Sequence, residues 1–175
     1  SSTTSRAVIQ HDLTADSNIY ASLSEGFKAG GYATYECTEP YDPEEVTSLE
    51  FGFKGSLGDN TSLNASLFRY DYTDFQVLQV VGIQTVTRNA GDATVNGLEL
   101  EALTNVSDSL TLNYGVTLLD ATYGEFLNTN GLEPQLGEQQ LEGNYLSNAP
   151  KVSVNFGLNY TSILSSGSSL TYRAN

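Results

Sequence analysis

Apolar and polar residues alternate one by one over long stretches of this chain. Residues 110–118 read LTLNYGVTL, and residues 152–160 read VSVNFGLNY, so Leu, Tyr, Val and Phe share one parity while Thr, Asn, Gly and Ser share the other. Residues 18–27 and 47–55 repeat the pattern. A period of two predicts β-strands whose two faces meet different surroundings.

A helix is the alternative interpretation for residues 97–102, GLELEA. The leucines there do not recur at the three-to-four spacing of an amphipathic helix, and the Thr, Val and Gly just upstream are poor helix formers. We therefore predict a strand, with Glu99 and Glu101 on the face opposite Leu98 and Leu100.

The length of these alternating runs favours strands that cross a bilayer. Soluble strands usually have about five or six residues, whereas a membrane-crossing strand needs about 9 to 11. The polar parity, made of Gly, Ser, Asn, Thr and occasional Glu or Lys, suits a wet interior with lipid on the apolar side. Polar connectors at 57–60 and 106–109 are short, those at 33–44 and 124–149 are longer, and 79–84 is short; this bias is typical of outer-membrane barrels.

One segment interrupts the alternation. In residues 62–77 the apolar parity runs through Leu63, Ala65 and Leu67 and then passes to Phe68 and the tyrosines that follow. A bulge near Leu67 and emergence from the membrane at that point both account for the switch.

Composition excludes several functional classes. The net charge of -14 leaves no basic stripe for a nucleic-acid partner, and no run of about 18 apolar residues predicts a transmembrane helix. Cys37 is the single cysteine and His11 the single histidine, so the chain has no internal disulfide and no recognisable catalytic or metal-binding motif. We predict no enzyme activity, no catalytic or metal site and no cofactor.

Six segments, in order along the chain, resemble the barrel of TonB-dependent outer-membrane receptors. They are YASLSEGFKAGGY (20–32), YDPEEVTSLEFGFKGSL (41–57), SLFRYDYTDFQV (66–77), NAGDATVNGLELEA (89–102), LTLNYGVTLLDATYGEF (110–126) and APKVSVNFGLNY (149–160). Residues 6–14 are similar to the remainder of a preceding strand.

The resemblance implies an all-β fold, an antiparallel up-and-down meander of about seven or eight long strands from a larger transmembrane barrel. Residues 1–175 are then expected to be an internal barrel segment, with the plug domain and the C-terminal closing strands outside it. The implied function is TonB-energised uptake of ferric siderophores or a similar scarce nutrient across the bacterial outer membrane. The implied partners are outer-membrane lipid, the TonB system through the plug, and an iron-chelate or other small-molecule cargo. The alternatives are a passive porin or adhesin barrel and a soluble secreted glycan-binding β protein.

Two groups of residues follow as candidates for function. Residues expected to face the barrel lumen, as structural or plug contacts, are Glu50, Lys54, Glu99, Glu101, Asn113 and Asn155. Aromatic candidates for ligand contact at the mouth are Tyr32, Tyr35, Tyr41, Tyr123, Phe126 and Tyr145, for which a solvated loop beside an interfacial aromatic belt is the alternative. Residues expected on the convex, lipid-facing side are Leu49, Phe51, Phe53, Leu98, Leu100, Leu110, Leu112, Val116, Val154, Phe156 and Leu158.

Overall fold

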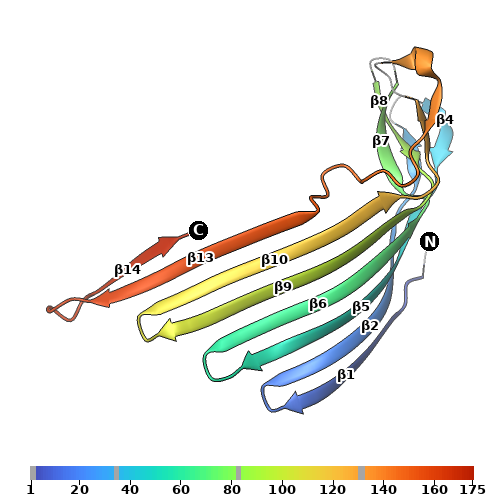
Figure 1. Cartoon of the computed structure of the whole chain (residues 1–175). Coiled ribbons are helices and arrows are strands. Elements are labelled where there is room, and N and C mark those ends of the chain that lie inside the picture. Colours follow the sequence, from blue (N-terminus) through green and yellow to red (C-terminus); the bar gives the residue numbers. More distant parts are fainter. Residues whose placement is uncertain (1–2, 34–35, 82–83, 130–132) are drawn as a thin grey trace.

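The fold is one curved antiparallel sheet with small hairpins at one end. A computed structural model describes residues 3–33, 36–81, 84–129 and 133–175. Eight strands form the sheet: β1 (Arg6–Thr14), β2 (Ser17–Lys28), β5 (Glu44–Leu57), β6 (Thr61–Thr73), β9 (Ala93–Ser107), β10 (Leu110–Tyr123), β13 (Val152–Ile163) and β14 (Ser169–Ala174). They follow one another in space in that order, as an up-and-down meander (Figure 1). The predicted fold class is confirmed.

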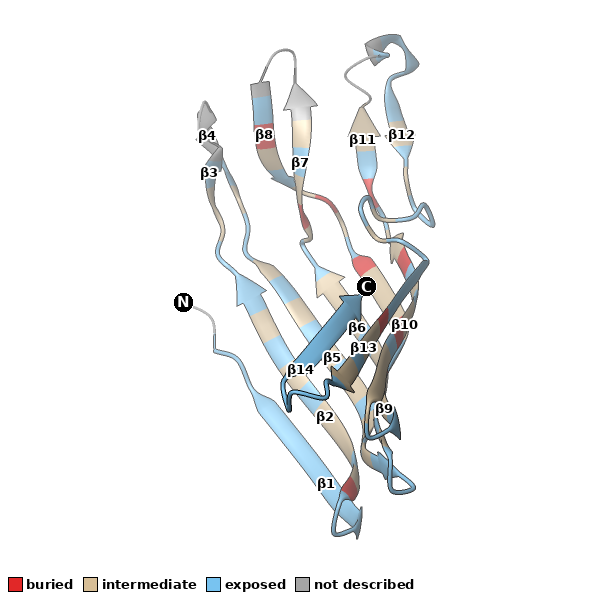
Figure 2. Cartoon of the chain, turned by 90° about the vertical axis from the view of Figure 1, so that its left-hand side faces the viewer, coloured by how far each residue is buried: buried red, intermediate tan, exposed pale blue. Residues whose placement is uncertain are grey.

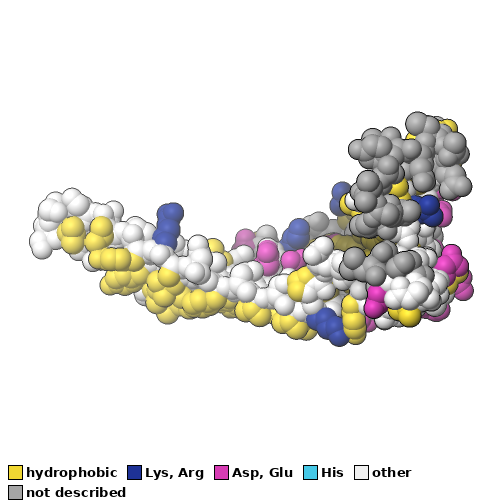
Figure 3. Space-filling view, turned by 90° about the horizontal axis from the view of Figure 1, so that it is seen from above, with side chains coloured by type: hydrophobic (Ala, Val, Ile, Leu, Met, Phe, Trp, Pro, Cys, Tyr) yellow, Lys and Arg dark blue, Asp and Glu magenta, His cyan; other side chains and the backbone are white. Residues whose placement is uncertain are grey.

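The register places apolar and polar residues on opposite faces. One row of direct cross-strand partners runs through Ala65, Leu100, Val116 and Val154. The adjacent row runs through Asn64, Glu101, Gly115 and Asn155. Because direct partners point to the same side, the eleven residues predicted for the convex side share one face. Figure 3 shows hydrophobic side chains along the convex side of the curved sheet and acidic side chains on its concave side.

No second layer formed by the described residues covers the convex face. Val154 is 70% exposed, Leu67 58% and Phe156 56%, and the sheet is open at both edges (Figure 2). A soluble sandwich would pack such a row against a second sheet. Exposed apolar side chains run along this face from Ile9 of β1 to Tyr172 of β14. Soluble monomers rarely expose such a continuous apolar surface, and this is the pattern of a lipid-facing wall. Among the described residues, no helix has both the length and the apolar character needed to span a membrane.

The connections differ in length at the two ends of the sheet. Tight turns join β1 to β2, β5 to β6, β9 to β10 and β13 to β14, whereas each connection at the other end contains a two-stranded hairpin. The hairpins are β3 (Gly31–Ala33) with β4 (Glu36–Tyr41), β7 (Gln76–Val81) with β8 (Gln84–Asn89), and β11 (Leu127–Thr129) with β12 (Glu138–Gln140). A 3₁₀ turn, η1 (Pro134–Leu136), lies within the third. The short connector predicted at 79–84 is corrected: residues 79–81 belong to β7 and residue 84 to β8, inside a connection that runs from residue 74 to residue 92.

The parity switch after Leu67 has no bulge. The register of β6 continues without a shift against both β5 and β9, so Phe68, Tyr70 and Tyr72 lie on the concave face. Arg69 and Asp71 point to the convex side, where Arg69 Nη2 lies 2.7 Å from Asp71 Oδ1. With a bulge excluded, the second explanation remains: β6 leaves the apolar layer of the membrane after Leu67.

Candidate functional site

A cluster of ionisable side chains lies on the concave face at mid-height of the sheet. The Tyr20 hydroxyl donates a hydrogen bond of 2.5 Å to Glu50 Oε1, and Lys54 Nζ lies 5.3 Å from the centre of the Tyr20 ring. Gly52 allows this arrangement because a Cβ at that position would fall 2.3 Å from the Tyr20 ring. Neither Glu99 nor Glu101 on β9 forms an ion pair within the part of the chain that the structure describes.

The six residues predicted for the lumen share this concave face. Lys54 lies in the same row of cross-strand partners as Asn64, Glu101 and Asn155. Glu99 comes two residues before Glu101 in β9 and therefore points to the same side. Asn113 and Asn155 each lie against a cross-strand glycine, Gly157 and Gly115 respectively. The face therefore presents carboxylates, amides and one ammonium toward the hollow of the sheet.

Aromatic rings follow the same face toward the hairpins. We define the aromatic ledge as Phe68, Tyr70, Tyr72, Phe75, Tyr123 and Phe126. The ring centres of Phe75 and Tyr123 lie 6.3 Å apart, and those of Tyr123 and Phe126 lie 5.2 Å apart. Tyr72 packs edge-on against Phe75 at 5.4 Å, and Phe68 stacks on Tyr70 at 4.8 Å. Side chains from β6, β10 and two connections thus form one inward-facing surface.

Four members of the ledge were not among the sequence candidates. Tyr123 and Phe126 were, and the structure brings them together with Tyr72 and Phe75. The signal for three of them, Phe68, Tyr70 and Tyr72, was the parity switch itself, because it moves the aromatics of β6 to the polar face of the sheet.

The remaining aromatic candidates lie elsewhere at the mouth. Tyr32 is 63% exposed, and Tyr41 lies across Gly31 in the same hairpin. Tyr145 pairs with Thr122, which neighbours Tyr123 in the strand, so Tyr145 lies on the opposite side of the sheet from Tyr123. The Lys151 ammonium sits 3.5 Å above the Tyr145 ring. Tyr35 falls outside the described residues.

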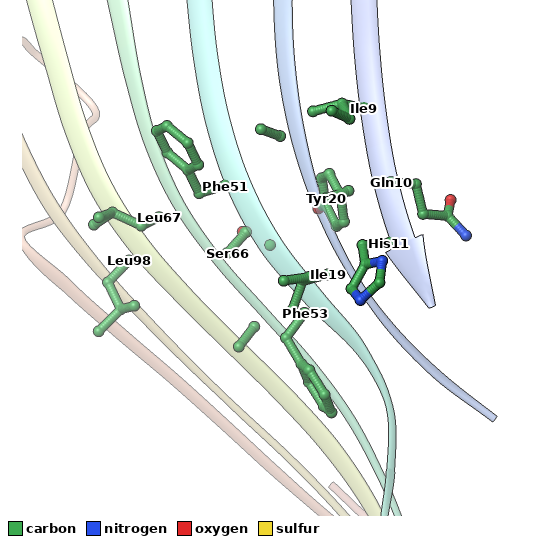
Figure 4. Close-up of a pocket in the computed structure, with 13 residues that line it drawn as sticks. Ile9, Gln10, His11, Ile19, Tyr20, Phe51, Phe53, Ser66, Leu67 and Leu98 are labelled. Carbon is green, nitrogen blue, oxygen red and sulfur yellow. The ribbon is translucent and has the colours of Figure 1, made fainter. Parts of the chain in front are cut away.

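A separate hollow of about 560 Å³ lies on the convex face (Figure 4). The small side chains of Ala21 and Ala65 leave space among larger neighbours, which are Ile9, Ile19, Phe51, Phe53, Leu67 and Leu98. Its wall is almost wholly apolar, which suits hydrocarbon rather than a polar ligand. We therefore assign it to the lipid-facing surface and not to the ligand site.

The concave face carries side chains that can bind a ligand or a protein domain. Within the described ranges, no three His, Cys, Asp or Glu side chains are close enough to hold a metal ion together. Hydroxyl, amide and carboxylate groups beside a row of aromatic rings can hold a ligand or a second protein domain through hydrogen bonds, charge and stacking.

Known proteins resemble this chain in sequence and in fold. Residues 1–175 match the family described as TonB dependent receptor-like, beta-barrel. The probable TonB-dependent siderophore receptor PiuA of Acinetobacter baumannii is 32% identical over 124 residues, which cover 68% of this chain and 16% of PiuA. The pesticin receptor of Yersinia enterocolitica is 34% identical over 95 residues, or 51% of this chain and 14% of that receptor.

The solved structures agree on the fold. The ferric yersiniabactin uptake receptor FyuA from Yersinia pestis superposes with a TM-score of 0.75 at 20% identity, over 96% of this chain and 24% of FyuA. The chain spans less than a quarter of the length of each of these relatives, which fits an open sheet taken from a larger barrel. It belongs to the TonB-dependent receptor β-barrel family, whose members reside in the outer membrane of Gram-negative bacteria.

Proposed function

We propose that this chain forms part of the wall and mouth of an outer-membrane receptor that takes up a ferric siderophore or a similar scarce nutrient, with energy supplied through TonB. The observation that carries the proposal is the division of the sheet into an apolar convex face and a concave face with carboxylates below an aromatic ledge. Relatives named as siderophore receptors support this cargo class. The wall performs no bond chemistry; it binds, orients and encloses.

The mid-height cluster serves a different purpose from the ledge in this proposal. Glu50, Glu99 and Glu101 outnumber Lys54, and they face the hollow of the sheet instead of lipid. Carboxylates confined in a barrel interior are stabilised by cationic or hydrogen-bonding groups opposite them. A plug domain inside the barrel would supply those groups, and Asn113 and Asn155 would extend the same contact.

Ligand contact is proposed for the aromatic ledge and the hairpins around it. Tyr123 and Phe126 lie at the base of the hairpins, where an incoming chelate would reach the wall. Their rings offer flat faces for stacking on an aromatic or conjugated ligand. Tyr32 and Tyr41 on the β3–β4 hairpin would contact cargo nearer the entrance of the barrel.

Uptake in cells tests the whole proposal. We expect a strain that depends on the complete receptor to accumulate radio-iron presented as ferric yersiniabactin, and to stop doing so when TonB is inactivated. The measurement is cell-associated iron against time under iron limitation. Accumulation that continues without TonB would instead support a passive porin.

Loss of one ring from the ledge should weaken ligand binding. Tyr123→Leu removes a ring proposed to stack on the ligand, together with its contacts to Phe75 and Phe126. Since an aromatic pair contributes about 0.5–1.5 kcal/mol, loss of the ring–ligand pair should raise the Kd for ferric yersiniabactin about two- to tenfold. Tyr145→Leu is the matched control, because Tyr145 lies on the other side of the sheet. Equal losses of affinity in the two variants, measured on isolated outer membranes, would contradict a ligand role for the ledge.

A further inference from the structure

The first two hairpins at the mouth are tied together at their bases by a buried glutamine. Gln76, the first residue of β7, is only 9% exposed. Its Nε2 donates hydrogen bonds of 3.1 Å to the backbone carbonyls of Ala29 and Asp42, which lie at the two ends of the β3–β4 hairpin. Its backbone N–H donates to Glu44 Oε2 at 2.7 Å. One side chain thus holds both ends of the neighbouring connection.

Asn89, the last residue of β8, completes this first joint. Its Oδ1 accepts a hydrogen bond of 2.7 Å from the Asp42 N–H, and its Nδ2 donates to the Asp42 carbonyl at 3.1 Å. The same Nδ2 donates to the Asp74 carbonyl at 2.6 Å. The backbone of Asp42 is therefore held by side chains from both ends of the β7–β8 hairpin.

A second joint, made differently, connects the second and third hairpins. The Gly124 N–H donates to the Asp92 carbonyl at 2.7 Å, and the Phe75 and Tyr123 rings pack against each other. Farther out, the Gln79 amide donates a hydrogen bond to Asn128 Oδ1. Gln76 takes no part in these contacts, so the two joints can be broken separately.

We propose that Gln76 is a positioning residue that fixes the β3–β4 hairpin against the β7–β8 hairpin, so that this part of the mouth is formed before any cargo arrives. The inference rests on the proposed function, because a preformed mouth matters only to a protein that captures a ligand there. Binding to a prearranged surface avoids the entropic cost of ordering loops around the ligand. Three carbonyl oxygens face the Gln76 amide, so a donor is required at this position.

Distances between spin labels test the assignment without any ligand. In the complete receptor, with Cys37 replaced by Ser, labels are attached to cysteines placed at Tyr32, Leu78 and Leu127, which are 63%, 76% and 60% exposed, one on each hairpin. Gln76→Glu puts carboxylate oxygens against the carbonyls and removes the donor. We expect the Tyr32–Leu78 distance distribution to broaden while the Leu78–Leu127 distribution stays as in the wild type.

Controls separate a local joint from general damage. Gln135→Glu makes the same chemical change at an exposed site in η1 and should alter neither distance. Gln76→Leu removes the donor without adding charge, and it serves as the test if the glutamate variant fails to assemble. It should broaden the Tyr32–Leu78 distribution and leave the Leu78–Leu127 distribution unchanged. An unchanged Tyr32–Leu78 distribution in Gln76→Leu would overturn the proposal, and so would equal broadening of both pairs. Since no cargo is involved, neither result depends on the uptake assay.

Discussion

Placing an arginine on the convex face at Phe156 is expected to impair assembly of the barrel severely. Phe156 is 56% exposed and lies at the centre of the apolar row of β13, which runs from Val152 to Tyr160. An arginine near the bilayer midplane of a β-barrel costs about 2–4 kcal/mol, because the guanidinium must leave water or distort the lipid. Folding yield in lipid vesicles, read from the gel shift of folded against unfolded receptor, measures the effect. Leu112→Arg on β10 should behave in the same way.

The neighbouring residue provides the control. Asn155 precedes Phe156 and points to the concave face, in the same cross-strand row as Glu101. Asn155→Arg adds the same side chain on the wet side, with a carboxylate two strands away, and should cost far less. Glu101→Gln should also have a small effect. Equal sensitivity of Phe156 and Asn155 to arginine would contradict the assignment of lipid and lumen faces.

The two faces of the sheet were predictable because period-two alternation shows which residues of a strand share a face. A strand that alternates over nine or more residues can place Glu99 and Glu101 on lipid only at high cost, so their side of the sheet follows from energetics. Direct pairing then extends the assignment from β9 to its neighbours, and the observed register agrees with it at each predicted position. The resemblance to TonB-dependent receptors identified the family, which alternation by itself does not distinguish from other barrels.

The mouth was less predictable because alternation does not mark where the membrane ends. Residues 76–81 (QVLQVV) and 84–89 (QTVTRN) contain the Val and Thr typical of strands, yet they form a hairpin outside the eight-stranded sheet. The bonds from Gln76 to Ala29 and Asp42 join positions 47 and 34 residues apart. Local pattern has no means of pairing such positions, since the contact exists only after two connections have folded side by side.

Gly91→Ala is expected to break the joint between the second and third connections. A Cβ on Gly91 would lie 1.6 Å from the Glu125 carbonyl oxygen and 2.8 Å from its carbon, so backbone and not a mobile side chain would have to move. Overpacking at well-packed sites costs about 1–3 kcal/mol, and this contact is closer than a rotamer change can relieve. The Gly124 N–H to Asp92 carbonyl bond beside it should open, so we expect faster amide hydrogen exchange across 90–92 and 123–126.

A second glycine-to-alanine change supplies the comparison. A Cβ on Gly31 would meet the end of the Tyr41 side chain, 2.8 Å from its hydroxyl, and that ring can rotate away. Gly31→Ala should therefore leave exchange near Gly91 unchanged and have little effect on assembly. Hydrogen exchange with mass spectrometry on the complete receptor in detergent compares the two variants peptide by peptide. If amides around Gly91 exchange at the wild-type rate in Gly91→Ala, the two connections have room to separate. The close backbone contact would then not be what holds the ledge residues Phe75 and Tyr123 together.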